Sequence, residues 1–383
     1  MAGPDFERHN AEVREVWAAY HAGDPARVPM TLGVNPRYVL LDPALNLEGI
    51  TFEGYFSDPD VMFETQLRFQ HWVRHNLEFD QEMGLPECWS VSVDFQNSHE
   101  ALWFGAPLRY FEGNVPDTVP FITDDTKQAF LDAGPPDPFS GWMARNWEYF
   151  EHMEARAEGY EFRGRPVSVS GLAGCGTDGP FTLGCSLRGA TELCTDIYAD
   201  PGFFHAFMGR ITDATIDRIK AFRRRLGQPV VSDEWGFADD SIQLLSVETY
   251  RQHVLPYHRR LVETFGRRGP NSIHLCGDAT HHFPMIRDEL NVMAFDTGYP
   301  VDHGKLRGML GRKVTIHGGP AVELLRAGSA ETVAAETRRI LESGVMRGGR
   351  FILREGNNLA PGTPPANVKA MYEACKRYGR YGQ

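Results

Sequence analysis

The chain has 383 residues, of which 42% are hydrophobic and 23% charged, and this ordinary globular balance excludes a disordered or collagen-like protein. Lys and Arg total 39 against 51 Asp and Glu, which gives a net charge of −12. Because an acidic surface repels phosphate backbones, the composition argues against nucleic-acid binding.

The first thirty residues are charged and interrupted by glycine and proline, and they lack the apolar core of a secretory signal. No stretch approaches the roughly 20 apolar residues that a membrane-spanning helix needs. The cysteines are scattered, which is typical of a reduced cytosolic protein rather than of a disulfide framework. We therefore expect a cytoplasmic protein without membrane contact. The cysteines are Cys88, Cys175, Cys185, Cys194, Cys276 and Cys375.

Eight β-rich runs lie along the chain, and in its second half they alternate with amphipathic stretches. Strands that alternate with helices predict βαβ units and a parallel sheet. Eight such units predict an α/β protein of the (β/α)8 TIM-barrel class. The runs are 27–34, 87–95, 167–172, 230–235, 272–277, 292–298, 314–319 and 349–356.

The amphipathic stretches predict four helices with recognisable starts. Asp200 and Pro201 have the pattern of an N-cap followed by proline at the first helical position, and apolar residues then recur every three or four positions to Leu226. The other three helices are expected from Ser246 to Phe265 with a kink at Pro256, from Ser329 to Gly344, and from Thr363-Pro364 onward.

We interpret residues 1–383 as a single barrel domain with two additions. Residues 1–26 form an N-terminal helical extension. The stretch from about 105 to 165 contains Pro-Pro-Asp-Pro at 135–138 and shows little periodicity. We expect this stretch to be an insertion over the barrel mouth rather than a separate domain.

The last five predicted strands end in polar residues followed by glycine. Barrel enzymes carry their catalytic groups at the carboxyl ends of strands, where glycine allows tight turns. Any strand can end in polar residues before a loop, but five such ends that contain His, Cys, Asp and Glu favour a functional site. The ends are Asp233-Glu234-Trp235-Gly236, His274-Leu275-Cys276-Gly277, Asp296-Thr297-Gly298, His317-Gly318 and Glu355-Gly356.

His274 and Cys276 are the most specific pair among these residues. Residues i and i+2 of a strand point to the same face, so an imidazole nitrogen and a thiolate can converge there on a zinc ion. The alternative is a buried cysteine beside a hydrogen-bonded histidine. A catalytic zinc also needs a third protein ligand. Glu355, His317 and Glu234 are candidates for this ligand, and spacing does not choose among them.

An ordered series of segments over roughly residues 90–380 resembles the uroporphyrinogen decarboxylase superfamily, and within it the cobalamin-dependent methyltransferases. This resemblance implies a (β/α)8 barrel, a cytoplasmic location and a zinc ion held by the H-x-C pair. It also implies a methyl group that passes to or from cobalamin on a separate corrinoid protein. The segments are G-P-F-T (179–182), L-R-G (187–189), D-E-W-G (233–236), L-P-Y (255–257), H-L-C-G (274–277), G-G-P (318–320), L-L-R-A-G-S (324–329) and T-P-P-A-N-V-K-A-M (363–371).

Two departures from the family patterns bear on the chemistry. Methyltransferases of the methanol and methylamine type carry a cysteine ligand just before the final T-P, and here Asn357 stands in its place. The decarboxylases carry R-Q-A-G-R in the first strand, of which only Arg37 remains, although Asp94 matches their aspartate after the second strand. One arginine is poor equipment for a substrate with many carboxylates, and decarboxylation needs no H-x-C. The methyltransferase interpretation therefore fits better.

We expect a zinc-dependent methyltransferase that moves a methyl group between a small methylated substrate and cobalamin on a corrinoid protein. The aromatic content favours O-demethylation of a methoxylated aromatic compound. Two alternatives stay open, a metal-free carboxy-lyase that uses Asp94 and Arg37, and a non-catalytic barrel that binds a corrinoid or tetrapyrrole. A homodimer also stays open. The residues expected to position or protonate the leaving group are Asp233, Asp296 and Glu355, and those expected to bind substrate are Arg37, Asp94 and His317.

Overall fold

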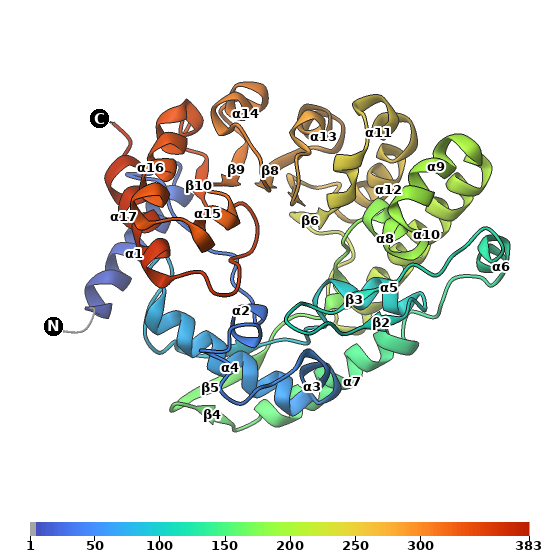
Figure 1. Ribbon diagram of the computed structural model, residues 1–383, viewed down its shortest axis with the longest axis horizontal. Coiled ribbons are helices and arrows are strands. Elements are labelled where there is room, and N and C mark those ends of the chain that lie inside the picture. The colour runs from blue at the N-terminus through green and yellow to red at the C-terminus, as the bar shows by residue number, and fades with distance from the viewer. Residues whose placement is uncertain (1–4, 383) are drawn as a thin grey trace.

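The computed structural model describes residues 5–382 as a mixed α/β fold in which helices surround short, mostly parallel strands (Figure 1). None of the described helices combines the length and apolar character needed to cross a membrane. The helices of the first half are α1 (Phe6–His21), α2 (Arg37–Leu40), α3 (Phe52–Ser57), α4 (Pro59–Asn76), α5 (His99–Trp103), α6 (Lys127–Asp132), α7 (Gly141–Ala157), α8 (Pro180–Arg188) and α9 (Ala190–Ala199). Those of the second half are α10 (Pro201–Arg225), α11 (Val247–His253), α12 (Leu255–Phe265), α13 (Phe283–Leu290), α14 (His303–Leu310), α15 (Val322–Ala327), α16 (Ala330–Ile340) and α17 (Pro365–Tyr378).

The parallel strands form two arcs. The larger arc has the order β10-β9-β8-β7-β6, and in the smaller arc β1 pairs in parallel with β5, whose other edge carries the antiparallel β4. A separate antiparallel hairpin joins β2 and β3. The strands are β1 (Trp89–Val91), β2 (Leu108–Arg109), β3 (Asp117–Thr118), β4 (Glu161–Phe162), β5 (Arg165–Val169), β6 (Trp235–Ala238), β7 (Asn271–Leu275), β8 (Val292–Thr297), β9 (Thr315–Gly318) and β10 (Phe351–Leu353).

The first predicted strand extends the larger arc at β10. Met30 forms a parallel bridge with Leu353, and the Leu353 N–H donates to the Pro29 carbonyl at 2.9 Å. The eight strand positions therefore follow one another in the order expected for a (β/α)8 barrel. Within residues 5–382, however, no ladder joins β5 to β6 or the Met30 segment to β1. The ring visible in Figure 1 consists of two hydrogen-bonded arcs rather than one continuous ladder.

The fourth predicted strand is wrong in its position. The two valines at 230 and 231 indicated a strand over 230–235, but the strand is β6, which begins at Trp235. The burial alternates from this point, because Trp235 and Phe237 pack into the core while Gly236 between them faces inward. Asp233 and Glu234 therefore precede the strand, and the residues that follow it are Asp239 and Asp240.

The four predicted helices are present, with their starts close to the expected positions. Asp200 caps α10 by accepting a hydrogen bond from the Phe203 N–H, and Ser329 caps α16 in the same way through Thr332. The second helix is broken into α11 and α12 at Val254, close to Pro256. The last helix, α17, begins at Pro365 rather than at Thr363.

The two predicted additions contain defined elements. Helix α1 lies in the expected N-terminal extension, where the Trp17 indole donates to the Asp80 carbonyl at 2.7 Å. The stretch from 105 to 165 contains the β2–β3 hairpin, α6, α7 and β4, and α7 packs against β5 and α4. Its placement over the barrel mouth stays a prediction.

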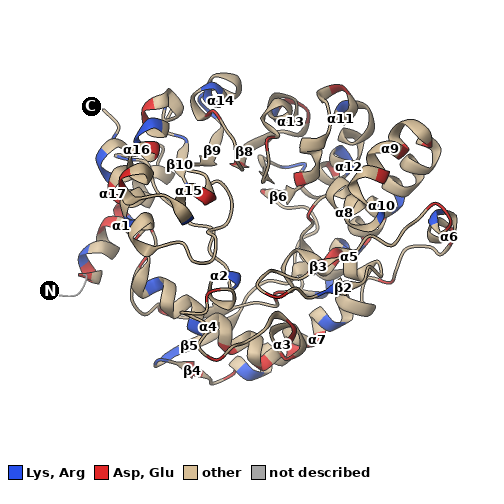
Figure 2. Ribbon diagram, viewed as in Figure 1, with Lys and Arg blue, Asp and Glu red and all other residues tan. Residues whose placement is uncertain are grey.

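Figure 2 shows both signs of charge interspersed over the outer helices, so the net charge of −12 is not confined to one of them.

A buried ion pair joins the first strand position to the last helix. Arg27 donates to both carboxylate oxygens of Asp80, at 2.7 and 2.6 Å, and Asp80 also accepts from the Met30 N–H at 2.7 Å and the Tyr372 hydroxyl at 2.9 Å. The Asp80 side chain has no exposed surface. Four donors therefore converge on one carboxylate where the chain of the first strand meets α17.

We expect Asp80→Asn to lower the free energy of unfolding by about 3 kcal/mol, because removing one partner leaves a buried charge uncompensated. Urea unfolding followed by circular dichroism measures the change. The matched control is Glu48→Gln, which removes the exposed ion pair between Glu48 and Arg68 and should cost at most about 1 kcal/mol. Equal effects of the two substitutions would contradict a structural role for the buried pair.

Candidate functional site

The site lies where β7, β8 and β9 end side by side. In the parallel register His274 of β7 pairs with Asp296 of β8, and Asp296 pairs with His317 of β9. Parallel pairing puts these three residues at one level, and all three line the same central cavity. The sheet therefore brings together polar residues that lie more than 40 positions apart in the sequence.

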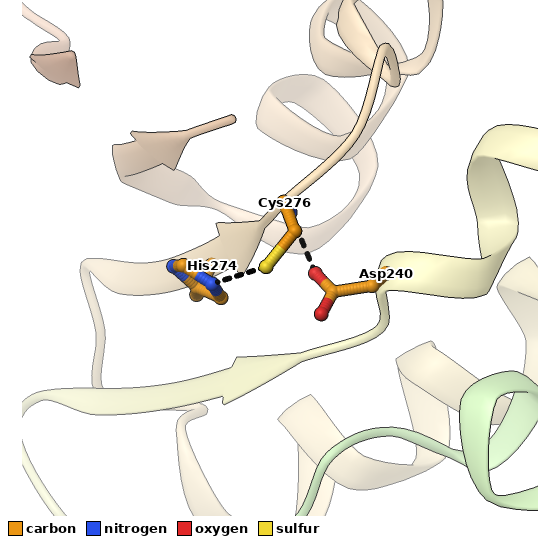
Figure 3. A group of neighbouring side chains, drawn as sticks. All are labelled: Asp240, His274 and Cys276. Atoms are coloured by element: carbon orange, nitrogen blue, oxygen red, sulfur yellow. Dashed lines mark hydrogen bonds between the residues drawn. The ribbon is translucent and has the colours of Figure 1, made fainter. Parts of the chain in front are cut away.

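The side chains of Asp240, His274 and Cys276 converge near this end of the strands, as Figure 3 shows. The His274 Nε2 atom is 3.0 Å from the Cys276 Sγ atom, and Asp240, just after β6, accepts the Cys276 N–H at 2.6 Å. One ligand atom from each of the three residues lies within 4.8 Å of the other two. We call these residues the 240–274–276 group.

Sequence reasoning missed Asp240. The misplaced strand put Asp233 and Glu234 at the carboxyl end of β6, whereas both residues come before it. Asp233 is 88% exposed and lies 3.6 Å from Arg268. If W-G-F-A is taken as the strand, Asp239 and Asp240 follow its carboxyl end, where barrel enzymes carry catalytic groups. The pattern of polar residues after a strand was therefore present, a few residues beyond Asp233 and Glu234.

Asp296 orients the histidine of the group. Its Oδ2 atom lies 2.7 Å from His274 Nδ1 and also accepts a hydrogen bond from Arg354. Because a carboxylate only accepts, Nδ1 carries the proton, and in the neutral ring Nε2 offers its lone pair to the group. Burial opposes ionisation of both residues, but their mutual hydrogen bond raises the pKa of His274 and, with the Arg354 charge, lowers the pKa of Asp296.

The electrostatics of the group keep its cysteine protonated in the absence of a cation. Burial raises the pKa of Cys276, and the carboxylates of Asp240 and Asp296 raise it further. The thiol accordingly donates to the Asn357 Oδ1 atom at 3.3 Å. An imidazole, a thiol and a carboxylate are ligands that zinc accepts, and a carboxylate behind the histidine is the usual outer partner of such a site. These residues therefore fit a zinc ion with three protein ligands and a fourth position left for substrate.

None of the three predicted third ligands belongs to the group. Glu234 precedes β6 and lies at the wrong end of the strand. His317 lines the cavity outside the group, and burial lowers its pKa. Glu355 is fully buried and faces the first strand, where its Oε1 atom accepts the Gly33 N–H at 2.7 Å. Its other oxygen has no hydrogen-bond partner among the described residues.

A cavity of about 610 Å³ lies inside the ring, and His274 of the group lines it. Its polar lining includes His274, Asp296, His317 and Arg354 together with His99, Thr177, Asp178 and Ser272, and Leu172, Phe237 and Ile273 are among its apolar residues. The cavity exists because the inward positions two residues before Ala238, His274 and Asp296 carry small side chains. These small residues are Gly236, Ser272 and Ala294.

A second, polar pocket of about 300 Å³ lies beside Asn358, and we call it the amide pocket. Arg37 Nε donates to Gln96 Oε1 at 3.0 Å, and Gln96 Nε2 donates to the Asp94 carboxylate at 2.6 Å. Arg37 and Asp94 therefore share one pocket, while His317 lines the other. The residues that line the amide pocket are Asn35, Pro36, Arg37, Gln66, Ser92, Val93, Asp94, Gln96, Asn97 and Asn358.

The 240–274–276 group opens on the large cavity, which His274 lines. Its Cys276 contacts Asn357, and the next residue along the chain, Asn358, lines the amide pocket.

Comparison with known proteins gives a match to one family. The sequence pattern described as uroporphyrinogen decarboxylase (URO-D) matches residues 104–378. A methylated-thiol–coenzyme M methyltransferase from Methanosarcina mazei is 30% identical over 201 residues, which make up 51% of each chain. A uroporphyrinogen decarboxylase from Geobacter metallireducens is 29% identical over 225 residues, 57% of this chain and 62% of that protein. A methylcobamide:CoM methyltransferase from Methanosarcina mazei is 27% identical over 200 residues, 50% of this chain and 57% of that protein.

The chain thus spans between 51% and 62% of the length of these curated relatives. Among solved structures, a methyltransferase from Methanosarcina mazei covers 96% of this chain and 98% of its own, with a TM-score of 0.65 and 17% identity. This likeness extends over the whole fold and agrees with the mixed α/β architecture described above.

The orphaned carboxylate oxygen of Glu355 predicts a dependence of stability on pH. Burial raises the pKa of Glu355 from 4.5 to about 7, so the folded protein holds a proton that the unfolded chain releases. Relative to Glu355→Gln, which has no proton to lose, stability should therefore fall by about 3 kcal/mol as the pH rises from about 4.5 to 7, and it should level off above 7. Denaturant unfolding of both proteins at pH 5 and pH 8 measures the difference. Parallel pH profiles would show that Glu355 ionises normally.

Proposed function

The chain belongs to the uroporphyrinogen decarboxylase family, and we propose that it is a zinc-dependent methyltransferase within it. The enzyme would move a methyl group between a small methylated substrate and cobalamin carried by a corrinoid protein. The observation that carries this proposal is the 240–274–276 group, whose His274 lines the large cavity. A methyl donor bound in that cavity would lie next to the three candidate metal ligands.

The distribution of charge supports methyl transfer over decarboxylation. A substrate with many carboxylates needs several unpaired cations to hold it. In the large cavity Arg354 is already paired with Asp296, and the amide pocket contains one arginine, Arg37. A thiol, an imidazole and a carboxylate in close contact have no evident use in binding carboxylates, whereas they suit a zinc ion.

Each residue of the group has a defined task in this proposal. His274, Cys276 and Asp240 would hold the metal, and Asp296 would keep the imidazole in the orientation that presents Nε2. Bound zinc would supply Lewis acidity, which polarises a methoxy oxygen or lowers the pKa of a thiol. In O-demethylation a Co(I) corrinoid on the partner would supply the electron pair that binds the methyl carbon, the bond between methyl carbon and oxygen would break, and the oxygen would keep its electron pair and leave as phenolate.

The large cavity suits a small methylated compound. Its volume of about 610 Å³ lies within the usual range for small-molecule sites, and its wall combines apolar residues with a few polar groups. Leu172, Ala173 and Ala294 would contact an aromatic ring, while His317 and Arg354 would face its polar substituents. These contacts support a methoxylated aromatic compound as the substrate.

The relatives support the same chemistry. Two of them are methyltransferases by name, one for a methylated thiol and one for methylcobamide, and coenzyme M is named in both. The similarity to the methylcobamide enzyme supports a corrinoid as the donor or acceptor of the methyl group in the reaction proposed for this chain.

Metal analysis tests the proposed zinc site. We expect the purified protein to contain one zinc ion per chain and Cys276→Ala to contain none. Asp296→Asn should lower metal affinity by about 10- to 100-fold, because the outer partner of a metal-bound histidine contributes on this scale. The matched control is Asp278→Asn, which changes an exposed aspartate two residues beyond Cys276 and should retain full zinc. A wild-type protein without zinc, or Cys276→Ala with unchanged zinc, would contradict the proposal.

A second candidate function is a carboxy-lyase that works without metal. The decarboxylase relative and the Arg37–Gln96–Asp94 chain in one pocket favour it. The discriminating experiment incubates metal-stripped protein with uroporphyrinogen. Formation of partly decarboxylated porphyrinogens would support the carboxy-lyase and contradict a zinc-dependent methyltransferase.

A further inference from the structure

The large cavity has two polar residues that the proposed methyl transfer does not use. His99 is the first residue of α5, and Asp178 lies two residues before α8 begins at Pro180; both line the cavity. Along the chain they follow β1 and β5 of the smaller arc, whereas His274 and Asp296 belong to strands of the larger arc. Figure 1 shows α5 across the ring from β9 and β10. We call His99 and Asp178 the 99–178 pair.

The imidazole of His99 presents a hydrogen-bond acceptor that no described residue uses. Its Nδ1 atom lies 3.2 Å from the Gln96 carbonyl oxygen, so Nδ1 carries the proton and Nε2 keeps a lone pair. Burial lowers the pKa of His99, which keeps the ring neutral. Only 8% of the residue is exposed, and among the described residues Nε2 has no hydrogen-bond partner. A buried acceptor without a partner costs free energy, which a ligand with a donor would recover.

The carboxyl group of Asp178 likewise makes no hydrogen bond with the described residues. The turn that carries it is held in place by Glu100, the neighbour of His99 in α5. One Glu100 oxygen accepts the Asp178 N–H at 2.7 Å and the Thr177 hydroxyl at 3.0 Å, and the other accepts from Arg218 at 2.6 Å. The buried Glu100 thus fixes both segments of the pair to one support and leaves the Asp178 carboxyl group to the cavity.

A hydroxyl group complements this pair better than a charged group does. The Nε2 atom of His99 needs a donor, and a hydroxyl group donates one hydrogen bond while it accepts others. Burial raises the pKa of Asp178, and the carboxylates of Glu100 and Asp240 raise it further, so this side chain offers an O–H donor as well as an acceptor. A carboxylate on the ligand brings no donor for His99, and an ammonium group brings no acceptor for the Asp178 proton.

The turn of Asp178 also contacts the strand that leads to the candidate metal site. The Ala238 N–H of β6 donates to the Thr177 carbonyl at 3.4 Å, and Asp240 follows two residues after Ala238. His274 of the 240–274–276 group lines the same cavity as the 99–178 pair. One small ligand can therefore place one substituent at the pair and another at the group.

We propose that His99 and Asp178 form a subsite for a hydroxyl group of the methylated substrate. This inference rests on the proposed methyltransferase function and narrows its substrate class. The aromatic substrate would be a methoxyphenol, whose free hydroxyl group bonds to the 99–178 pair while its methoxy group faces the proposed zinc site.

Probes that differ only in the hydroxyl group test the subsite on the full chain. Methoxybenzene is compared with the three isomers of methoxyphenol by titrations that follow the methyl signal of each compound in NMR spectra. We expect at least one methoxyphenol to bind at least about tenfold more tightly than methoxybenzene, which corresponds to about 1.4 kcal/mol. If no isomer binds more tightly, the inference is wrong. Tighter binding of 4-methoxybenzylamine than of every methoxyphenol would show that the pair takes a cation and would also overturn it.

Substitutions locate the preference for the hydroxyl group. Asp178→Ala and His99→Phe should each weaken methoxyphenol binding by about threefold to tenfold, because each removes a hydrogen bond, and leave methoxybenzene binding unchanged. Asp178→Asn keeps a donor and an acceptor and should retain most of the preference. The matched control is Asp125→Ala, which alters an exposed aspartate outside the cavity lining. Melting curves identify the folded variants, and a preference that survives Asp178→Ala would overturn the assignment even if His99→Phe does not fold.

Zinc content and methyl transfer to free cob(I)alamin, measured on the same samples, separate this inference from the proposed function. If the wild-type protein contains zinc and demethylates methoxybenzene as well as every methoxyphenol, the subsite is wrong and the enzymatic function stands. If the protein contains no zinc and transfers no methyl group, the proposed function fails, and the binding preference for a hydroxyl group alone decides whether the 99–178 pair is a subsite.

Discussion

The hydrogen bond between His274 and Asp296 is the interaction on which the site depends. It joins the ends of two neighbouring strands at the same level of a parallel ladder, so it forms only if β7 and β8 keep their register. A slip of one residue would turn every side chain of one strand to the opposite face. The register of the sheet therefore determines the geometry of the 240–274–276 group.

The charges around this bond are nearly balanced but leave room for a cation. Two carboxylates, Asp240 and Asp296, face one guanidinium group, Arg354, and one imidazole. Burial raises the pKa of Cys276, and the surplus of negative charge from Asp240 and Asp296 raises it further, so the thiol stays protonated. The same imbalance favours a divalent ion at the proposed zinc site.

The sequence predicted the strands correctly where the residue pattern of each run agreed with its place in the sheet. The strands β7, β8, β9 and β10 are short apolar runs that end in polar residues and glycine, and the sheet indeed brings His274, Asp296 and His317 together. It failed at β6, where W-G-F-A contains a glycine that strands disfavour. Gly236 lines the large cavity, so the residue that hid the strand is one that the cavity requires. The error also hid Asp240, because a residue cannot be placed at the end of an unrecognised strand. The contact of Asn357 with Cys276 joins residues 81 positions apart, which follow β10 and β7 of the same arc, so it depends on the strand order of the sheet and not on any local pattern.

Asp240 and Asn357, which both contact Cys276, indicate how the proposed zinc site would work with one sulfur ligand. Asn357 stands where the resemblance places a cysteine, and it contributes an uncharged oxygen beside Cys276. Asp240 restores the lost negative charge, so a zinc ion held by His274, Cys276 and Asp240 would carry the same net charge as one held by a histidine and two cysteines. A carboxylate is a harder and less electron-donating ligand than a thiolate. The bound metal would then be the stronger Lewis acid, which favours polarising the oxygen of a methoxy group over activating a thiol.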